Sequence, residues 1–391
     1  MQGLEAGISL ILGVEGGSVT SVDIRSTRLV QASRMLAGRS PAQVTTILPT
    51  IFALCGTAQG LAAASAMEDA LGQPAPPSQR MARHLLLLLE TIAEHALGVL
   101  RDWPVLLGGP SSDLTAAKAL RPCLAASRRA LYPDGDWARP GGGRLAVARP
   151  ALNEQIRVLS GIAERLFAAS PGECCENLNI FEAWMGRGDG PAASLLSRIH
   201  RDDLDGFGRS PFRPMAESGP SDLVTRLEDD HDGSYLAQPD CAGHPLETNA
   251  LTRRMRHPLI AGLMERHGNG LTPRFAARLV EIAASLREAE DLVQDLCDDP
   301  GIPVGMEGSG RGLGRIDAAR GLLVHGVELE EGVVRRYQIL APTEWNFHPR
   351  GPLHHGLLGC EAGPDLERRA RLAVIALDPC VACTVEITHH A

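Results

Sequence analysis

Two cysteines near the end of the chain carry the sharpest chemical signal in the sequence. Cys380 and Cys383 belong to the motif DPCVAC, residues 378–383. Two thiols three residues apart can point at one metal ion, and thiolates select soft or borderline metals. The spacing also suits a redox pair or half of a structural zinc site. Zinc would need two more ligands, and the chain has no second CxxC motif, so a metal site requires a cysteine from another segment.

Cys55 is the candidate for that further thiol. It ends the apolar stretch FALC, residues 52–55, and precedes Gly56. An isolated cysteine in such surroundings is usually a small core residue, so the local sequence leaves both roles open. Cys174 and Cys175 are adjacent, which sends their side chains in different directions and favours a structural role.

The elements that must position these residues are predicted to be mainly helices. Apolar periodicity and helix-start signals predict helices over residues 41–71, 78–103, 152–167, 272–296 and 365–376. Alternating apolar and polar residues predict two hairpins, one pairing residues 8–14 with 18–25 and one pairing 321–329 with 333–340.

Three other stretches have no strong periodicity. Residues 101–150 are rich in Pro and Gly and are predicted to be loops. Residues 171–244 are expected to be short helices and loops at the surface. The glycine-rich residues 301–314 lack the Gly-Lys-Ser/Thr that completes a phosphate-binding loop, so that function is disfavoured.

Composition excludes several classes of function. The 391 residues are 44% hydrophobic and 22% charged, as is usual for a folded domain. The net charge is −9 and no Lys/Arg-rich stripe occurs, so no nucleic-acid partner is expected. The longest apolar runs, such as Leu85–Leu89, are too short to cross a membrane. Nine cysteines without a signal-peptide pattern predict reduced thiols in the cytoplasm.

Linked segments of the chain resemble the large subunit of nickel–iron hydrogenases. The segments GRSP (38–41) and AMEDALG (66–72) align with that family without gaps between them. The segments DAARGLLVH (317–325) and YQILAPTEWN (337–346) resemble two later family segments. DPCVAC matches the second metal motif of the family. The likeness covers residues 1–75 and 300–391, and residues 76–299 do not align. It implies a single domain, 1–391, mainly α with small β-hairpins, like a shortened large subunit.

The resemblance also implies a partial set of metal ligands. In that family four cysteines hold nickel and iron, and the second cysteine of each pair bridges the two metals. The bridging positions are Cys55 and Cys383 here, and Cys380 stands at a position that binds nickel only. The other nickel-only position is Phe52, whose side chain cannot ligate a metal. We therefore expect iron, as Fe(CN)₂CO, rather than nickel.

Hydrogen-bond donors for the cyanide groups are implied by the same likeness. Arg320 lies in the DAARGLLVH segment, and Pro342 and Thr343 lie in YQILAPTEWN. A guanidinium and a hydroxyl are suited to cyanide nitrogen, which is an acceptor. Taken singly, Arg320 could be an ordinary ion-pair residue and Thr343 a turn residue.

Other positions depart from the family. Ser33, Gln59 and Glu386 stand where it has Glu, His and His, and Thr50 replaces an Arg. The family residues at the positions of Ser33 and Glu386 help to hold magnesium. A maturation protease cuts after the family His at the position of Glu386. Only five residues follow Glu386, so we expect no cleavage.

This pattern resembles the HupK/HoxV type of hydrogenase accessory protein. The resemblance implies a maturation scaffold that carries or assembles Fe(CN)₂CO for a hydrogenase large subunit, with other maturation proteins as partners. Two alternatives stay open. One is a catalytic large subunit, which Glu5 favours because it matches the family's proton-relay glutamate. The other is a metal-free descendant that serves as a protein-interaction surface.

Overall fold

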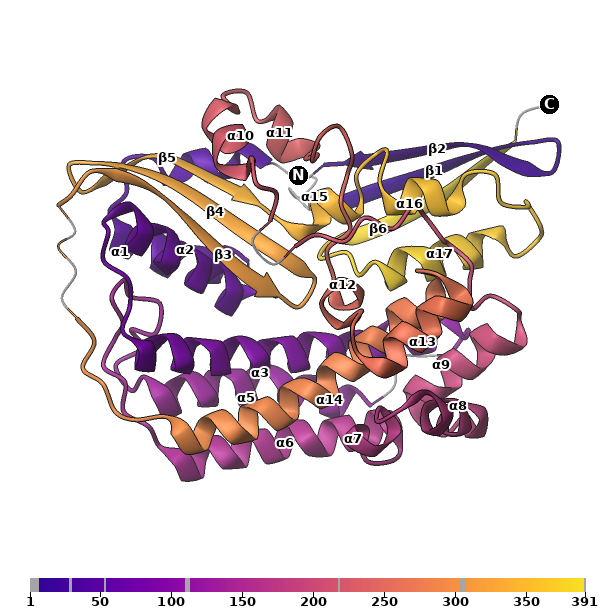
Figure 1. Cartoon of the computed structure of the whole chain (residues 1–391), viewed down its shortest axis with the longest axis horizontal. Coiled ribbons are helices and arrows are strands. Elements are labelled where there is room, and N and C mark those ends of the chain that lie inside the picture. Colours follow the sequence, from indigo (N-terminus) through magenta and orange to yellow (C-terminus); the bar gives the residue numbers. More distant parts are fainter. Residues whose placement is uncertain are drawn as a thin grey trace.

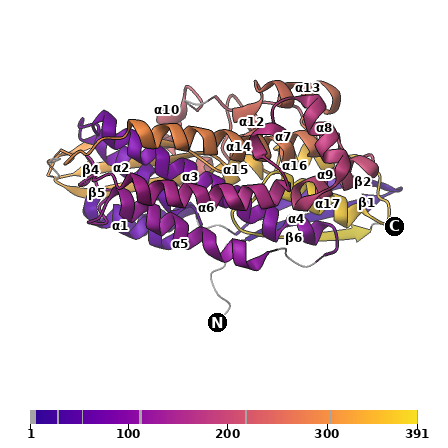
Figure 2. The ribbon, with the colours of Figure 1, turned by 90° about the horizontal axis from the view of Figure 1, so that it is seen from below.

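The structure is a computed structural model that describes residues 7–27, 30–52, 54–109, 113–216, 219–302, 305 and 307–389. Glu5 lies outside the described residues. Four long helices form a layer along one side of the molecule, seen at the bottom of Figure 1 and lying together in Figure 2. They are α3 (Pro77–Arg101), α5 (Leu114–Leu131), α6 (Arg149–Phe167) and α14 (Leu271–Asp295). Among the described helices, none combines the length and the apolar composition that crossing a membrane requires.

Helix α5 lies in the region that the sequence predicted to be loops, so that prediction is wrong. Asp113 caps the helix, accepting a hydrogen bond from the backbone N–H of Ala116 at 2.9 Å. Pro122 stands inside the helix, where proline removes a backbone donor and usually signals a break. Burial of one face, including Leu120 and Leu131, outweighs that local cost.

The remaining described helices are shorter. They are the 3₁₀ helix η1 (Val30–Leu36), α1 (Pro41–Ile51), α2 (Gly56–Ala70), α4 (Trp103–Leu106), α7 (Pro171–Cys174), α8 (Leu178–Arg187), α9 (Gly190–Arg201), α10 (Leu223–Asp229), α11 (Ser234–Ala237), α12 (Ala250–Arg254), α13 (Pro258–His267), α15 (Pro342–Asn346), α16 (Pro352–Leu357) and α17 (Leu366–Ala376). The described part of residues 171–244 consists of short helices and loops, as expected. It is not confined to the surface, because Cys174, Cys175, Phe181 and Trp184 are buried in the core.

One sheet lies over α2 (Figure 1). It is antiparallel with the order β3 (Gly310–Ala318), β4 (Gly321–Glu330), β5 (Val333–Leu340). The β4–β5 hairpin is the predicted one, but β3 falls in the glycine-rich stretch and was not predicted. Its glycines face α2, since a Cβ added at Gly312 would lie 2.2 Å from the amide nitrogen of Ala70 and one at Gly314 would lie 1.9 Å from the carbonyl oxygen of Ala62. The glycines therefore let the strand and the helix approach closely.

The second sheet joins the two ends of the described chain. Its order is β2 (Ser18–Ser26), β1 (Gly7–Glu15), β6 (Ala382–His389), and β1 and β2 form the predicted hairpin. Strand β6 pairs with β1 in parallel, with Ile8 opposite Cys383. No strand was predicted from the sequence after residue 376. The pairing places the CxxC motif beside the first strand.

The predicted helix over residues 41–71 is two helices, α1 and α2, with a break at residues 52–55. Pro49 stands in the last turns of α1. A Cβ on Gly56 would lie 2.8 Å from the carbonyl oxygen of Pro49, so glycine lets α2 begin directly against α1. The break leaves Cys55 at the start of α2 rather than in a helix interior.

Candidate metal centre

Cys55 is the N-cap residue of α2, and its side chain makes no capping hydrogen bond. The carboxylate of Glu90, on α3, does so instead. It accepts hydrogen bonds from the backbone N–H groups of Thr57 at 2.7 Å and Ala58 at 2.9 Å. A carboxylate is well placed at the positive end of a helix dipole, so this buried contact holds the start of α2, and the Cys55 thiol with it, against α3.

Cys380 lies close to Cys55 and to Thr343. The hydroxyl oxygen of Thr343 is 3.1 Å from Cys380 Sγ. Thr343 is 4% exposed and follows Pro342, the buried first residue of α15. Burial raises the pKa of the Cys55 thiol to about 12, assisted by the negative charges of Glu90 and Cys380 and opposed by Arg320. A thiol with such a pKa loses its proton readily only when a cation takes the proton's place.

Arg320 comes to the same place from the turn between β3 and β4. Its Nη1 donates to Glu94 Oε2 at 2.8 Å, and its Nε lies 3.8 Å from Asp378 Oδ2. Burial raises the pKa of Glu94 to about 7, although Arg320 works against that rise. The buried Nε of Arg320 has no hydrogen-bond acceptor among the described residues. A ligand carrying acceptor atoms would satisfy such a donor.

Asp378, at the start of the CxxC motif, is held between two arginines. Its carboxylate lies 3.5 Å from Arg278 Nη2 on one side and 3.8 Å from Arg320 on the other. Burial would raise the pKa of Asp378, but the two guanidinium groups outweigh burial and hold the pKa below its usual value. The residue has φ of 55°, a left-handed conformation that aspartate tolerates better than most residues. The ion pairs fix this turn, and thereby the direction of the chain into Cys380.

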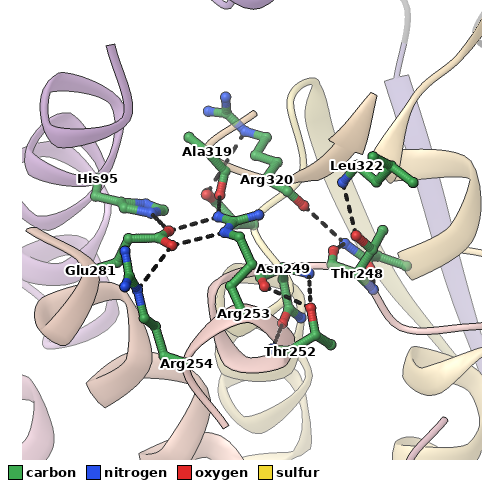
Figure 3. Close-up of polar contacts among 12 residues, drawn as sticks. His95, Thr248, Asn249, Thr252, Arg253, Arg254, Glu281, Ala319, Arg320 and Leu322 are labelled. Atoms are coloured by element: carbon green, nitrogen blue, oxygen red, sulfur yellow. Dashed lines mark hydrogen bonds and ion pairs between the residues drawn. The ribbon is translucent and has the colours of Figure 1, made fainter. Parts of the chain in front are cut away.

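A second buried carboxylate supports the backbone next to Arg320 (Figure 3). Glu281, on α14, accepts hydrogen bonds from Arg253 Nε at 2.8 Å and Nη2 at 2.6 Å, and lies 2.8 Å from His95 Nε2 on α3. Arg253 Nη2 also donates to the carbonyl oxygen of Ala319 at 2.8 Å. The network therefore ties α3, α12 and α14 to the residue that precedes Arg320.

Cys383 lies on β6, three residues beyond Cys380, and packs partly into the core near α17. Burial raises the pKa of its thiol to about 11, and Arg371 opposes the rise. It lines a cavity of about 860 Å³ together with Cys380, Arg320 and Asp378. Within the described part of the chain, no three side chains of Cys, His, Asp or Glu form a group that could hold a metal ion by themselves.

The predicted site residues therefore converge in part. Cys55, Cys380, Arg320 and Thr343 come together from four segments, and Cys383 lies on the wall of the adjoining cavity. Phe52 is the C-cap residue of α1, its carbonyl oxygen accepts the Cys55 N–H at 3.2 Å, and its ring packs against the core beneath the sheet of β3, β4 and β5. Two thiols, a free guanidinium donor and a hydroxyl fit an iron fragment that brings diatomic acceptor ligands of its own.

Sequence reasoning missed several residues that shape the site. Glu90 and Glu94 stand four residues apart within the leucine-rich helix α3, and acidic residues on a buried apolar face were a usable signal. Gln59 was noted only as a departure, but its amide nitrogen lies 3.7 Å from Cys55 Sγ. Its contacts with His325 had no local signal, because the two residues are far apart in sequence.

Comparisons with known proteins concern the family and the fold of the chain. The family model described as nickel-dependent hydrogenase matches residues 262–386. The fold is similar to that of the Ni-Fe-Se hydrogenase from D. vulgaris Hildenborough, with a TM-score of 0.66, 17% identity and 94% of each chain covered.

Sequence relatives are closer and match nearly the whole chain. The hydrogenase expression/formation protein HupK of Rhizobium leguminosarum bv. viciae is 32% identical over 98% of this chain and 97% of its own length. The hydrogenase expression/formation protein HoxV of Cupriavidus necator is 30% identical over 91% of this chain and 90% of its own. The chain therefore belongs to the family of hydrogenase expression/formation proteins that includes HupK and HoxV.

Proposed function

We propose that this chain serves hydrogenase maturation as a scaffold that carries Fe(CN)₂CO toward the large subunit of a nickel–iron hydrogenase. The relatives are named for hydrogenase expression and formation, which supports the maturation role. The iron fragment is cargo in this proposal, and the partners are other maturation proteins that deliver it and the large subunit that receives it.

The observation that carries the proposal is the meeting of Cys55, Cys380, Thr343 and Arg320 beside an open cavity. Thiolates supply iron–sulfur bonds, while Arg320 Nε, which lies 3.8 Å from Asp378, is a buried donor without a hydrogen-bond acceptor among the described residues. A hydrogen bond from a guanidinium to cyanide nitrogen is charge-assisted and therefore strong. The cavity of about 860 Å³ gives the fragment a route in and out, as a carrier requires.

Infrared spectroscopy of the anaerobically purified full chain tests the proposal. Protein produced in a host with the hydrogenase maturation machinery should show cyanide and carbonyl stretching bands. Metal analysis should find iron and little nickel. Cys55→Ala should abolish the bands, because it removes a metal–thiolate bond. Bands that survive in Cys55→Ala would contradict the site, and a full complement of nickel with hydrogen turnover would replace the scaffold with an enzyme.

The C-terminal thiolate is identified by two further variants. The resemblance gives the bridging position to Cys383, so Cys383→Ala should lose the bands and Cys380→Ala should keep them. The 3.1 Å contact between the Thr343 hydroxyl and Cys380 Sγ favours Cys380 instead. Loss of the bands in Cys380→Ala alone would therefore assign the second iron thiolate to Cys380. Cys360→Ala is the matched control, because Cys360 is half-buried and lies outside the site.

A further inference from the structure

A buried row of polar groups runs from Cys55 into the sheet of β3, β4 and β5. Gln59 lies one turn after Cys55 on α2, and its Nε2 is 3.7 Å from Cys55 Sγ. Gln59 Oε1 is 2.9 Å from His325 Nε2 on β4, and His325 Nδ1 is 2.7 Å from the hydroxyl of Tyr337 on β5. The three side chains are 2%, 0% and 3% exposed, so water does not compete for these contacts.

The direction of each hydrogen bond follows from the groups themselves. An amide oxygen only accepts, so His325 Nε2 must carry the hydrogen that it shares with Gln59. Burial lowers the pKa of His325 to about 3 and raises that of Tyr337, so the imidazole is neutral and the phenol keeps its proton. A neutral imidazole has one N–H, and Nδ1 therefore accepts from the Tyr337 hydroxyl. The row leaves the amide N–H of Gln59 facing the sulfur of Cys55.

We propose that Gln59 is a positioning residue that donates a hydrogen bond to the Cys55 sulfur, with His325 and Tyr337 holding its amide in that orientation. A metal-bound thiolate has no hydrogen of its own and can only accept such a bond. Hydrogen bonds to a ligating sulfur reduce its donation to the metal. In the iron-loaded protein this hydrogen bond would weaken the bond between Cys55 and iron, and that consequence rests on the proposed function. The existence of the hydrogen bond between Gln59 and Cys55 does not rest on it.

Alkylation of Cys55 tests the hydrogen bond without any metal. The full chain, freed of metal by a chelator, is treated with iodoacetamide at one fixed pH, and peptide mass spectrometry follows Cys55 and Cys383 together. Gln59→Leu removes the donor, which should slow alkylation of Cys55 roughly two- to tenfold, the factor that a typical net hydrogen bond corresponds to. Cys383 in the same samples should react at an unchanged rate.

Tyr337→Phe tests whether the row sets the orientation from a distance. It keeps the ring and removes only the hydroxyl, so His325 loses the donor that fixes its tautomer. Alkylation of Cys55 should slow here too, although by less than in Gln59→Leu. A purely structural loosening would speed alkylation, because it exposes the thiol, and the sign therefore separates the two explanations. Unchanged or faster alkylation of Cys55 in both variants would overturn the proposal.

Ile339→Val is the matched control, because Ile339 lies opposite His325 on β5 and takes no part in the row. Its alkylation rates should equal those of the wild type. In protein that carries the iron fragment, Gln59→Leu and Tyr337→Phe should also move the carbonyl band to lower wavenumber, since a stronger sulfur donor pushes more electron density onto the metal. If wild-type protein shows no bands, the proposed function fails, while the alkylation rates still decide the hydrogen bond.

Discussion

At the scale of single residues, the ring of Phe52 occupies the position that the resemblance gives to a nickel-binding thiolate. It lies one turn before Cys55, and its backbone carbonyl holds the Cys55 N–H. An apolar ring supplies no ligand. The aligned positions then offer at most three thiolates, Cys55, Cys380 and Cys383, where nickel in that family has four.

Phe52→Cys should therefore give the protein measurable nickel binding. The change also removes a ring that packs against the core, which should lower the free energy of unfolding by about 1–4 kcal/mol. Nickel content after dialysis against a known nickel concentration measures the first effect, and thermal melting measures the second. Phe52→Leu is the control, since it disturbs packing without adding a thiol. Equal nickel in the two variants would mean that position 52 does not face the metal site.

Glu281 is the residue whose charge most directly links stability to pH. Burial would raise its pKa, but Arg253 and His95 outweigh burial and hold the pKa well below the usual value. A lowered folded-state pKa contributes stability that is fully present above the ordinary carboxyl value and is lost as pH falls through the lower one. Glu281 should therefore add to acid unfolding of the native protein.

Glu281→Gln should lower the free energy of unfolding at pH 7 by about 3–5 kcal/mol, because it leaves buried arginine without its carboxylate. The variant should also lose less stability than the wild type when pH falls below about 4. Urea unfolding at a series of pH values measures both effects. Parallel pH curves for the two proteins would show that the pKa of Glu281 does not differ between the folded and unfolded states.

At the scale of elements, the fit of β3 against α2 controls where Cys55 lies. Gly314→Ala would place a methyl group 1.9 Å from the carbonyl oxygen of Ala62, so strand and helix must separate. Overpacking of this kind typically costs about 1–3 kcal/mol, and backbone is less able than a side chain to give way. Gly161→Ala, in α6, is the control, because nothing lies within 4 Å of the added methyl.

The melting temperature should fall for Gly314→Ala, whereas it should be unchanged or raised for Gly161→Ala, since alanine is favoured over glycine inside a helix. Displacement of α2 should also weaken the infrared bands of the first variant only. A Gly314→Ala protein as stable as the wild type would show that β3 does not contact α2 closely.

The sequence predicted those elements whose patterns are local. Alternation over Ile8–Val14 and over residues 321–340 predicted both hairpins. The resemblance predicted one site made of Cys55, Cys380, Cys383, Arg320, Pro342 and Thr343, and the structure places Cys383 on the wall of the adjoining cavity. Strand β3 was hidden because its glycines serve a contact with α2 instead of an alternating pattern. Helix α5 was hidden by Pro122. The ion pairs of Arg320 with Glu94 and Asp378 depend on tertiary structure alone, so no local pattern could reveal them.

At the scale of the whole molecule, β6 closes the structure by joining the end of the chain to its first strand. Truncation after Cys383 would leave that thiol in place but remove most of β6, so β1 would lose its neighbour from Ser9 to Val14. An uncovered strand edge invites aggregation. We expect a lower melting temperature, association in light scattering and loss of the infrared bands. Truncation after His389, which keeps β6 whole, is the control, and identical behaviour of the two truncations would contradict this role.

The parallel pairing of β1 with β6 also has a consequence in time. The hydroxyl of Thr388 donates to the carbonyl oxygen of Leu12, 376 residues earlier in the chain. A ribosome that adds about 5–20 residues per second needs roughly 20–75 s between making the two strands. Until β6 is made, β1 has only β2 beside it in the sheet, and Cys55 lacks Cys380 for nearly as long. The candidate site therefore cannot form before Cys380 and β6 have been made, and under the proposed function capture of the iron fragment has to wait for them.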